Sequence, residues 1–228
     1  MKPLRMLPLI YYLATKGAMQ HPIVLTTVEL GKELKVSQQT ASRLLRQLEG
    51  LGFIKREAFK RGQYVILTDK GLELLSQVYV GLQKVFGEVP EVLTLEGEVF
   101  TGLGEGAFYV TREGYRSQFI KKLGFEPFPG TLNLRIKNIN GINTRRLLEH
   151  YQGIEIQGFS NGLRTYGPVK CFKAKINGKL DGALLLIKRS HYGFDVAEII
   201  SAYNLRKELN LRDGDLVHVG VRVKTVEA

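Results

Sequence analysis

The chain has 228 residues, of which 44% are hydrophobic and 24% are charged, a composition typical of a globular protein with room for two modest domains. Its net charge of +11 suggests a polyanionic partner, either a nucleic acid or the phosphates of a nucleotide, and a solubilising surface without a partner is the alternative. The single cysteine, Cys171, excludes an internal disulfide, and no apolar run approaches the ~18 residues of a membrane span, so we expect a cytoplasmic protein with no membrane partner.

Residues 1–88 have the pattern of a mostly helical domain with one hairpin. Periodicity and capping residues predict these elements in order: a helix over 4–14, a second from Thr26 or Thr27, a third from Ser37 to about Leu51, strands over 53–56 and 64–67, and a last helix from Asp69. A helix–turn–helix followed by a two-stranded wing places its third helix in the major groove of DNA while the wing contacts the backbone.

The exposed face of the third helix carries side chains of the kinds that read base edges or hold phosphates. These candidate DNA-binding residues are Gln38, Gln39, Thr40, Ser42, Arg43 and Arg46, joined by Lys60 and Arg61 at the tip of the wing. Residues 1–90 contain 13 basic and 7 acidic residues, so they carry +6 of the +11 on the shorter part of the chain. A basic cluster on a helix and wing favours double-stranded DNA as the partner.

The segment over 34–45 resembles the winged helices of MarR-like regulators, and the similarity covers most of residues 25–75. That resemblance implies a winged helix-turn-helix domain that binds DNA, commonly as a homodimer on paired half-sites. The apolar segments 4–14 and 72–86 are the candidate dimer elements. Winged helices also serve as protein–protein modules, and this alternative stays open.

From Gly87 onward the pattern changes, with a short linker expected over 89–96 and a second domain over 97–228. Short alternating segments predict strands near 99–100, 108–110, 132–136, 154–158, 171–176, 183–187 and 216–223, with helices near 143–151 and 203–209. The absence of regular strand–helix alternation favours an all-β or barrel-like domain with helical insertions over a βαβ sheet. The fold class expected for the whole chain is therefore α+β in two domains.

Three segments of the second domain carry candidate chemistry. The first, called the glycine loop below, is Thr101–Ala107, in which alternate glycines permit positive φ and turn several N–H groups toward one point, a geometry that holds anions. In the second, Thr131 and Asn133 lie two apart on a predicted strand and point to one side, where a hydroxyl and an amide oxygen suit Mg²⁺. An ordinary hairpin turn and two surface polar residues are the alternatives.

The third segment mixes charged, aromatic and amide side chains over 189–206. The three segments together, in this order, resemble the archaeal CTP-dependent riboflavin kinases over about residues 97–220. The resemblance implies a cradle-loop β-barrel that transfers the γ-phosphate of CTP to riboflavin, giving FMN and CDP, with Mg²⁺ as cofactor. Some members of this family carry an N-terminal winged helix, as this chain does.

Carried over residue by residue, the resemblance assigns roles in four groups. The nucleotide would be held by Gly102, Leu103, Gly104, Glu105, Gly106 and Ala107 and by Tyr203, Asn204, Leu205 and Arg206, Mg²⁺ by Thr131 and Asn133, and the flavin by Ser190 and Glu198. Ser190 stands where the family pattern has threonine, and Tyr203 where a smaller apolar residue is usual. Glu198 is the expected carboxylate for orienting or deprotonating the substrate hydroxyl, with Glu105 as a second candidate by position.

Three readings remain from the sequence. The chain is a kinase whose winged helix regulates genes, a flavin- or nucleotide-sensing transcriptional regulator without kinase activity, or a kinase whose winged helix serves only dimerisation. Intact Thr131, Asn133 and glycine loop favour an enzyme, because a pure sensor would be free to lose its metal ligands.

Overall fold

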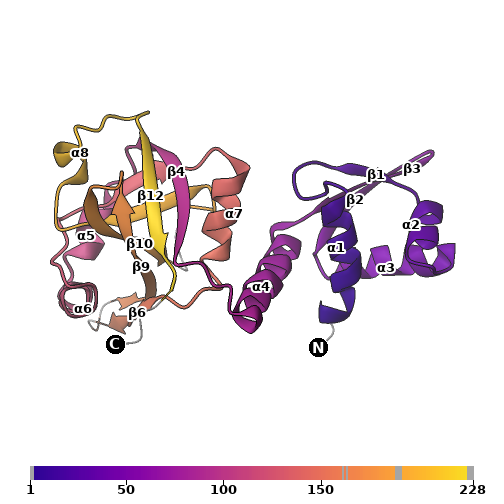
Figure 1. The fold of residues 1–228 in the computed structure, drawn as a ribbon, viewed down its shortest axis with the longest axis horizontal. Coiled ribbons are helices and arrows are strands. Elements are labelled where there is room, and N and C mark those ends of the chain that lie inside the picture. Colours follow the sequence, from indigo (N-terminus) through magenta and orange to yellow (C-terminus); the bar gives the residue numbers. More distant parts are fainter. Residues whose placement is uncertain (1–2, 161, 163, 188–191, 225–228) are drawn as a thin grey trace. The chain divides into compact units, whose positions relative to one another are not determined.

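The computed structural model describes residues 3–160, 162, 164–187 and 192–224, which form two compact units, Met1–Leu82 and Gln83–Ala228 (Figure 1). The boundary lies inside helix α4 (Asp69–Phe86), before the expected linker over 89–96. Most of that expected linker belongs to strand β4 (Val92–Phe100), because Val92 already pairs with Arg222 of the last strand. Among the helices that are described, none is long and apolar enough to cross a membrane.

The first unit is a three-stranded sheet with helices, in the order expected for a winged helix. Its elements are η1 (Pro3–Met6), α1 (Leu7–Thr15), β1 (Ile23–Leu25), α2 (Thr27–Glu33), α3 (Gln38–Gly50), β2 (Ile54–Phe59), β3 (Gly62–Leu67) and the first part of α4. The sheet order is β1-β3-β2, so the hairpin β2–β3 forms the wing and β1 adds a strand that the sequence pattern did not predict.

Side-chain caps fix where the two central helices of this unit begin. Thr26 accepts a hydrogen bond from the backbone N–H of Glu29, and the Glu29 carboxylate accepts one from the backbone N–H of Thr26, which makes a capping box for α2. Ser37 accepts a hydrogen bond from the backbone N–H of Thr40 and starts α3. The caps predicted from the sequence are confirmed, with Thr26 as the cap of the second helix.

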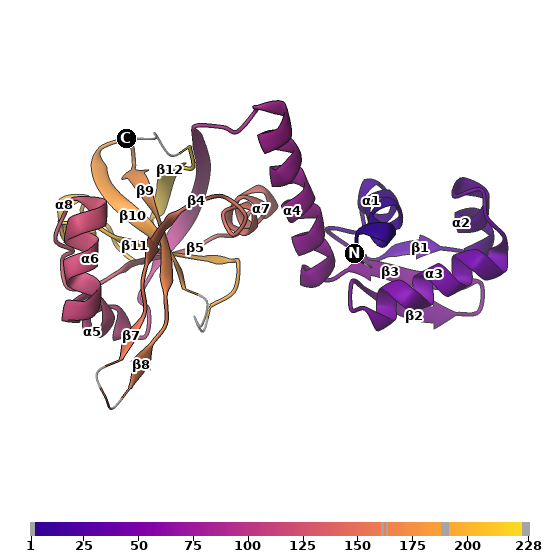
Figure 2. The same cartoon turned by 90° about the horizontal axis from the view of Figure 1, so that it is seen from below.

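The second unit is a closed barrel with helices on its outside (Figure 2). Its elements after β4 are α5 (Glu105–Val110), α6 (Glu113–Leu123), β5 (Leu132–Arg135), α7 (Ile139–Leu147), β6 (Ile154–Ile156), β7 (Phe159–Ser160), β8 (Thr165–Tyr166), β9 (Val169–Ile176), β10 (Leu180–Ile187), β11 (Val196–Ile200), α8 (Leu205–Glu208) and β12 (Leu216–Arg222). The strands run β10-β11-β5-β4-β12-β9, and β9 pairs again with β10 to close the ring. Helices α5 and α6 lie on the side of the barrel away from α7 (Figure 2).

The segment 108–110, expected as a strand, is the end of helix α5. Its aromatic and β-branched residues favour a strand when the segment is considered alone. In the structure, Val110 is buried and packs with Tyr115 and Phe119 of α6. The same cluster contains Cys171, which is fully buried on β9, and burial raises the pKa of its thiol to about 12. Cys171 therefore packs as a small apolar residue between α6 and the barrel.

Candidate active site and nucleic-acid interface

A row of residues across three adjacent strands marks the candidate active site. Asn133 on β5 lies opposite Phe100 on β4 and opposite Glu198 on β11. Residues directly opposite one another on neighbouring strands project to the same face of a sheet. The barrel thus brings the predicted metal ligand and the predicted carboxylate to one face, although they come from distant parts of the sequence.

The predicted metal ligands, Thr131 and Asn133, lie side by side. The Thr131 hydroxyl donates a hydrogen bond to Oδ1 of Asn133 at 3.2 Å, so two neutral oxygen atoms converge. Asn133 is only 9% exposed. Such oxygens fit Mg²⁺, whose other ligands would be phosphates and water. Within the described segments, no cluster of three His, Cys, Asp or Glu residues offers a competing metal site.

The glycine loop packs directly against this Thr131–Asn133 pair. A Cβ atom added at Gly102 would lie 2.3 Å from Nδ2 of Asn133, and one added at Gly106 would lie 2.5 Å from Oγ1 of Thr131. Of the three glycines in the loop, only Gly104 adopts a left-handed conformation, with φ of 79°. The prediction of positive φ is therefore correct for Gly104 and wrong for the other two glycines, which are required by close approach instead.

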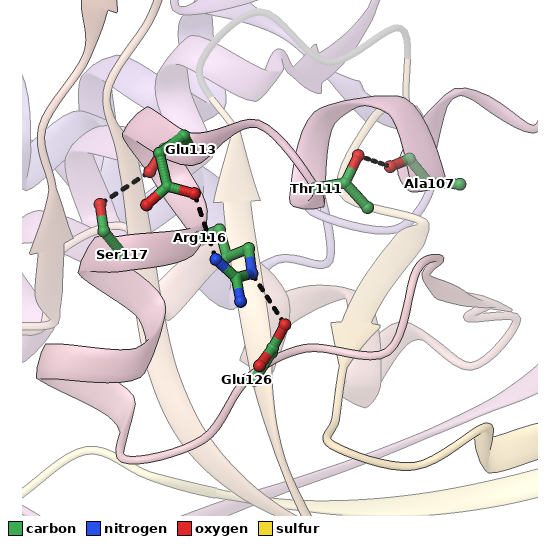
Figure 3. A network of polar contacts seen from close by, with 6 residues as sticks. All are labelled: Ala107, Thr111, Glu113, Arg116, Ser117 and Glu126. Carbon is green, nitrogen blue, oxygen red and sulfur yellow. Dashed lines mark hydrogen bonds and ion pairs between the residues drawn. The ribbon is translucent and has the colours of Figure 1, made fainter.

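A polar network holds the helices behind the glycine loop to the segment that leads into β5 (Figure 3). Arg116 on α6 donates a hydrogen bond to Glu126 at 2.7 Å and another to Glu113 at 3.2 Å. The bond from Arg116 and its positive charge lower the pKa of the Glu126 carboxyl, so the pair stays ionised at neutral pH. The hydroxyl of Thr111 donates to the carbonyl of Ala107 at 2.8 Å, between the last residue of the loop and the end of α5.

Glu198 lies in an environment that makes its carboxylate more basic. Burial raises the pKa of the carboxyl above its usual value, and the positive charge of Arg145 partly offsets this rise. No hydrogen bond or ion pair to the Glu198 carboxylate occurs in the described structure. A desolvated carboxylate of this kind can accept a proton from a substrate hydroxyl. The second candidate, Glu105, is exposed at the first turn of α5.

The predicted nucleotide segment lines a cavity of about 180 Å³ beside Thr131. Its walls include Tyr203, Asn204, Leu205 and Arg206 together with Phe128 and Ser201. Asn204 is held in place because it accepts the backbone N–H of Lys207 and so caps α8. Thr131 therefore lines this cavity and also bonds to Asn133. A larger cavity of about 410 Å³ over β4, β9 and β12 is lined by none of the predicted site residues.

Sequence reasoning missed Tyr192 and Arg145 at this site. The Tyr192 ring meets Phe100 edge to face, with ring centroids 5.7 Å apart, and its hydroxyl lies 3.2 Å from where a Cβ on Gly102 would stand. Tyr192 lies in the third segment, whose mixture of charged, aromatic and amide side chains could have identified it as a site residue. Nothing in the sequence near Arg145 indicated a role. The predicted flavin contact Ser190 lies outside the described residues.

In the first unit, the predicted DNA-binding residues differ in their solvent exposure and in their hydrogen bonds within the protein. Gln39, Arg43 and Arg46 are exposed on α3, because the opposite face of this helix is buried in the core. Lys60 and Arg61 are exposed at the turn between β2 and β3. These five residues form the surface that we call the basic face.

The other predicted residues of α3 are engaged within the protein. Gln38 donates its side-chain N–H to the hydroxyl of Thr27 at 3.1 Å. The Thr40 hydroxyl is hydrogen-bonded to Ser37, and Ser42 is half-buried. Gln38 thus links α3 to α2, and Thr40 bonds to the residue that caps α3. These side chains are therefore less available for DNA than those of the basic face.

The base of the wing is fastened to α3 by Arg56. Its guanidinium pairs with Glu49 near the end of α3 and donates to the side-chain oxygen of Gln63 on β3 at 3.0 Å. Because Arg56 on β2 contacts both α3 and β3, it links the wing to α3.

Comparisons with known proteins agree with both units. The family model of CTP-dependent riboflavin kinases, whose description is the domain of unknown function DUF120, matches residues 99–221, and a MarR family model matches residues 7–62. The chain belongs to the CTP-dependent riboflavin kinase family. The first match includes the glycine loop, the Thr131–Asn133 pair and Glu198, and the second includes the whole basic face.

Full-length relatives carry the same two parts. The chain is 45% identical to a riboflavin kinase of Archaeoglobus fulgidus over 216 residues, which are 95% of this chain and 91% of the relative. It is 46% identical to a riboflavin kinase of Pyrobaculum aerophilum over 197 residues (86% and 90%) and 38% identical to one of Methanosarcina acetivorans over 215 residues (94% and 90%). The similarity therefore extends through the first unit as well as the barrel.

Proposed function

We propose that this protein is a riboflavin kinase that transfers the γ-phosphate of CTP to the 5′-hydroxyl of riboflavin and releases FMN and CDP. The observation that carries the proposal is the convergence of the Thr131–Asn133 pair, the glycine loop, the cavity at 203–206 and the carboxylate of Glu198. Phosphoryl transfer needs mainly positioning and neutralisation of charge, and this arrangement supplies both. The kinase names of the relatives agree with the assignment.

In this mechanism CTP lies in the cavity beside Thr131, and its phosphates extend toward Arg206 and the glycine loop. The oxygens of Thr131 and Asn133 would hold Mg²⁺, which when bound supplies positive charge to the phosphates. Backbone N–H groups of the loop neutralise the remaining negative charge. The riboflavin 5′-oxygen bonds to the γ-phosphorus while the bond from that phosphorus to the β–γ bridging oxygen breaks, and Glu198 takes the hydroxyl proton as CDP leaves.

The basic face of the first unit is proposed to bind double-stranded DNA. Its five exposed polar and basic side chains are arranged on a helix and a wing, which is the geometry of groove and backbone contact. Fluorescence anisotropy with labelled duplex DNA tests this role. Binding should weaken steeply as salt rises, and Arg43→Ala should lower both the affinity and the salt slope. Absent or salt-insensitive binding would instead favour a winged helix that serves only dimerisation.

The kinase assignment is tested by measuring FMN formation from riboflavin and Mg²⁺ with CTP, ATP, GTP and UTP in parallel. CTP should be the main donor, and Thr131→Val, which removes one metal ligand but keeps the side-chain shape, should lower kcat/KM by about 100-fold. Thr94→Val is the matched control, because Thr94 is an exposed strand residue away from the site. If riboflavin or FMN binds but no nucleotide supports turnover, the protein is a flavin-sensing regulator and the kinase assignment fails.

A further inference from the structure

Asp213, in the turn between α8 and β12, connects two segments of the nucleotide site. Its Oδ2 accepts a hydrogen bond from the backbone N–H of Thr101, the first residue of the glycine loop, at 3.1 Å. Its Oδ1 accepts a hydrogen bond from the guanidinium of Arg206, which lines the nucleotide cavity, at 2.8 Å. One carboxylate thus bonds at the same time to the phosphate-facing loop and to the proposed nucleotide cavity.

The turn that carries Asp213 is itself held to the strand before the glycine loop. Val99 donates its backbone N–H to the carbonyl of Asp215 at 2.9 Å and accepts the N–H of Gly214 at 2.8 Å. Gly214 has φ of 94°, a conformation that favours glycine. The side chain of Asp215 closes the turn by accepting the N–H of Arg212 at 2.7 Å. Backbone bonds therefore fix where the Asp213 carboxylate stands.

We propose that Asp213 is a positioning residue for the nucleotide, which orients Arg206 and the start of the glycine loop so that both face the phosphates of CTP. This inference rests on the kinase function proposed above. Arg206 uses one terminal nitrogen for Asp213, and its other N–H groups have no partner in the described structure, so they remain for an anionic ligand. The same carboxylate holds the backbone N–H of Thr101 and so fixes the start of the glycine loop.

A purely structural role does not account for this arrangement. The side chains of Arg206 and Asp213 are 34% and 53% exposed, and ion pairs with that exposure contribute little to folding stability. The hydrogen bonds from Arg206 and Thr101 lower the pKa of the Asp213 carboxyl, so it stays ionised throughout the neutral range. The pair therefore persists under assay conditions, and its main effect is on the orientation of Arg206.

The test is the affinity for CTP and Mg²⁺ without riboflavin, measured by isothermal titration calorimetry on the full-length protein. Asp213→Asn keeps an acceptor for the Thr101 N–H but loses the ionic bond to Arg206. It should bind CTP about threefold to tenfold more weakly, because a mobile Arg206 must be immobilised on binding. Asp181→Asn is the matched control, since Asp181 forms a surface ion pair of similar length, 2.9 Å, with Lys175. Its CTP affinity should equal that of the wild type.

Two further measurements separate positioning from folding. Riboflavin affinity, followed by the quenching of flavin fluorescence, and the melting temperature of Asp213→Asn should both stay at wild-type values. In an Arg206→Ala background, Asp213→Asn should cause no additional loss of CTP affinity. CTP affinity that stays within twofold of wild type, that rises, or that falls equally in both backgrounds would overturn the proposal.

This test is independent of the kinase assignment, because it measures CTP binding and does not depend on turnover. A protein that binds CTP in an Asp213-dependent way but makes no FMN would retain the role of Asp213 and lose the kinase function. If the protein makes FMN but Asp213→Asn leaves its CTP affinity unchanged, the kinase function stands and the role of Asp213 is refuted.

Discussion

Gly102→Ala tests whether the glycine loop must lie against Thr131 and Asn133, the proposed metal ligands. The added Cβ would stand 2.3 Å from Nδ2 and 3.2 Å from Cγ of Asn133, and 3.2 Å from the hydroxyl of Tyr192. Real Cβ contacts are essentially never closer than 3.0 Å, so the loop or the amide must retreat by most of an ångström. Asn133 is 9% exposed and hydrogen-bonded to Thr131, which leaves its amide little room to turn away.

A displacement of about 1 Å in a positioning group can lower a rate by about 100-fold. We therefore expect kcat for FMN formation to fall by about that factor, while the melting temperature drops only modestly, since overpacking of one methyl group costs about 1–3 kcal/mol. Gly167→Ala is the control, because nothing lies within 4 Å of its Cβ position and its φ is outside the left-handed range. Full activity of Gly102→Ala with wild-type Mg²⁺ dependence would refute the close packing of loop and pair.

Three other predictions follow from burial and capping. Glu198→Gln should lower turnover. At pH values above the raised pKa of the Glu198 carboxyl it should nevertheless melt higher than the wild type, because ionising this buried group costs the folded state stability. The advantage should disappear below about pH 4, where the carboxyl is protonated in both the folded and the unfolded state, and melting curves across pH measure it. Cys171, whose thiol has a pKa of about 12 and no exposed surface, should react with a thiol reagent only after unfolding. Thr26→Ala should lower the free energy of unfolding of the first unit by about 1 kcal/mol in urea titrations, while Thr26→Ser retains the cap.

Local signals predicted the first unit well. Thr26 and Ser37 mark the starts of α2 and α3 because a capping side chain acts on backbone groups two or three residues away, and such signals are visible in one segment of sequence. Strand β1 was missed because it is only three residues long and gains its identity from pairing with β3. Its alternating burial over so short a segment carries too little pattern to be distinguished from a loop.

The barrel shows where local signals end. Residues 108–110, the end of helix α5, were expected as a strand because their apolar side chains fit either pattern, and contact with α6 decides between them. Strand β11 was not among the predicted strands, although it carries Glu198 opposite Asn133. The close approach of Gly102 to Asn133 and the contact of Asp213 with Thr101 both join distant parts of the chain, so no local pattern could reveal them.

The chemistry of the site depends on the register of the barrel as much as on the identity of its residues. Asn133 and Glu198 share a face only because β5 pairs with both β4 and β11 in one register, and a slip by one residue would turn either side chain to the opposite face. Closure of the ring through β9 and β10 resists such a slip, since every strand of the ring is paired on both sides. The burial that this closure imposes on Glu198 also raises the pKa of its carboxyl. Because a carboxyl with a raised pKa lowers the stability of the folded state once it ionises, the barrel holds Glu198 beside Asn133 at a cost in folding stability.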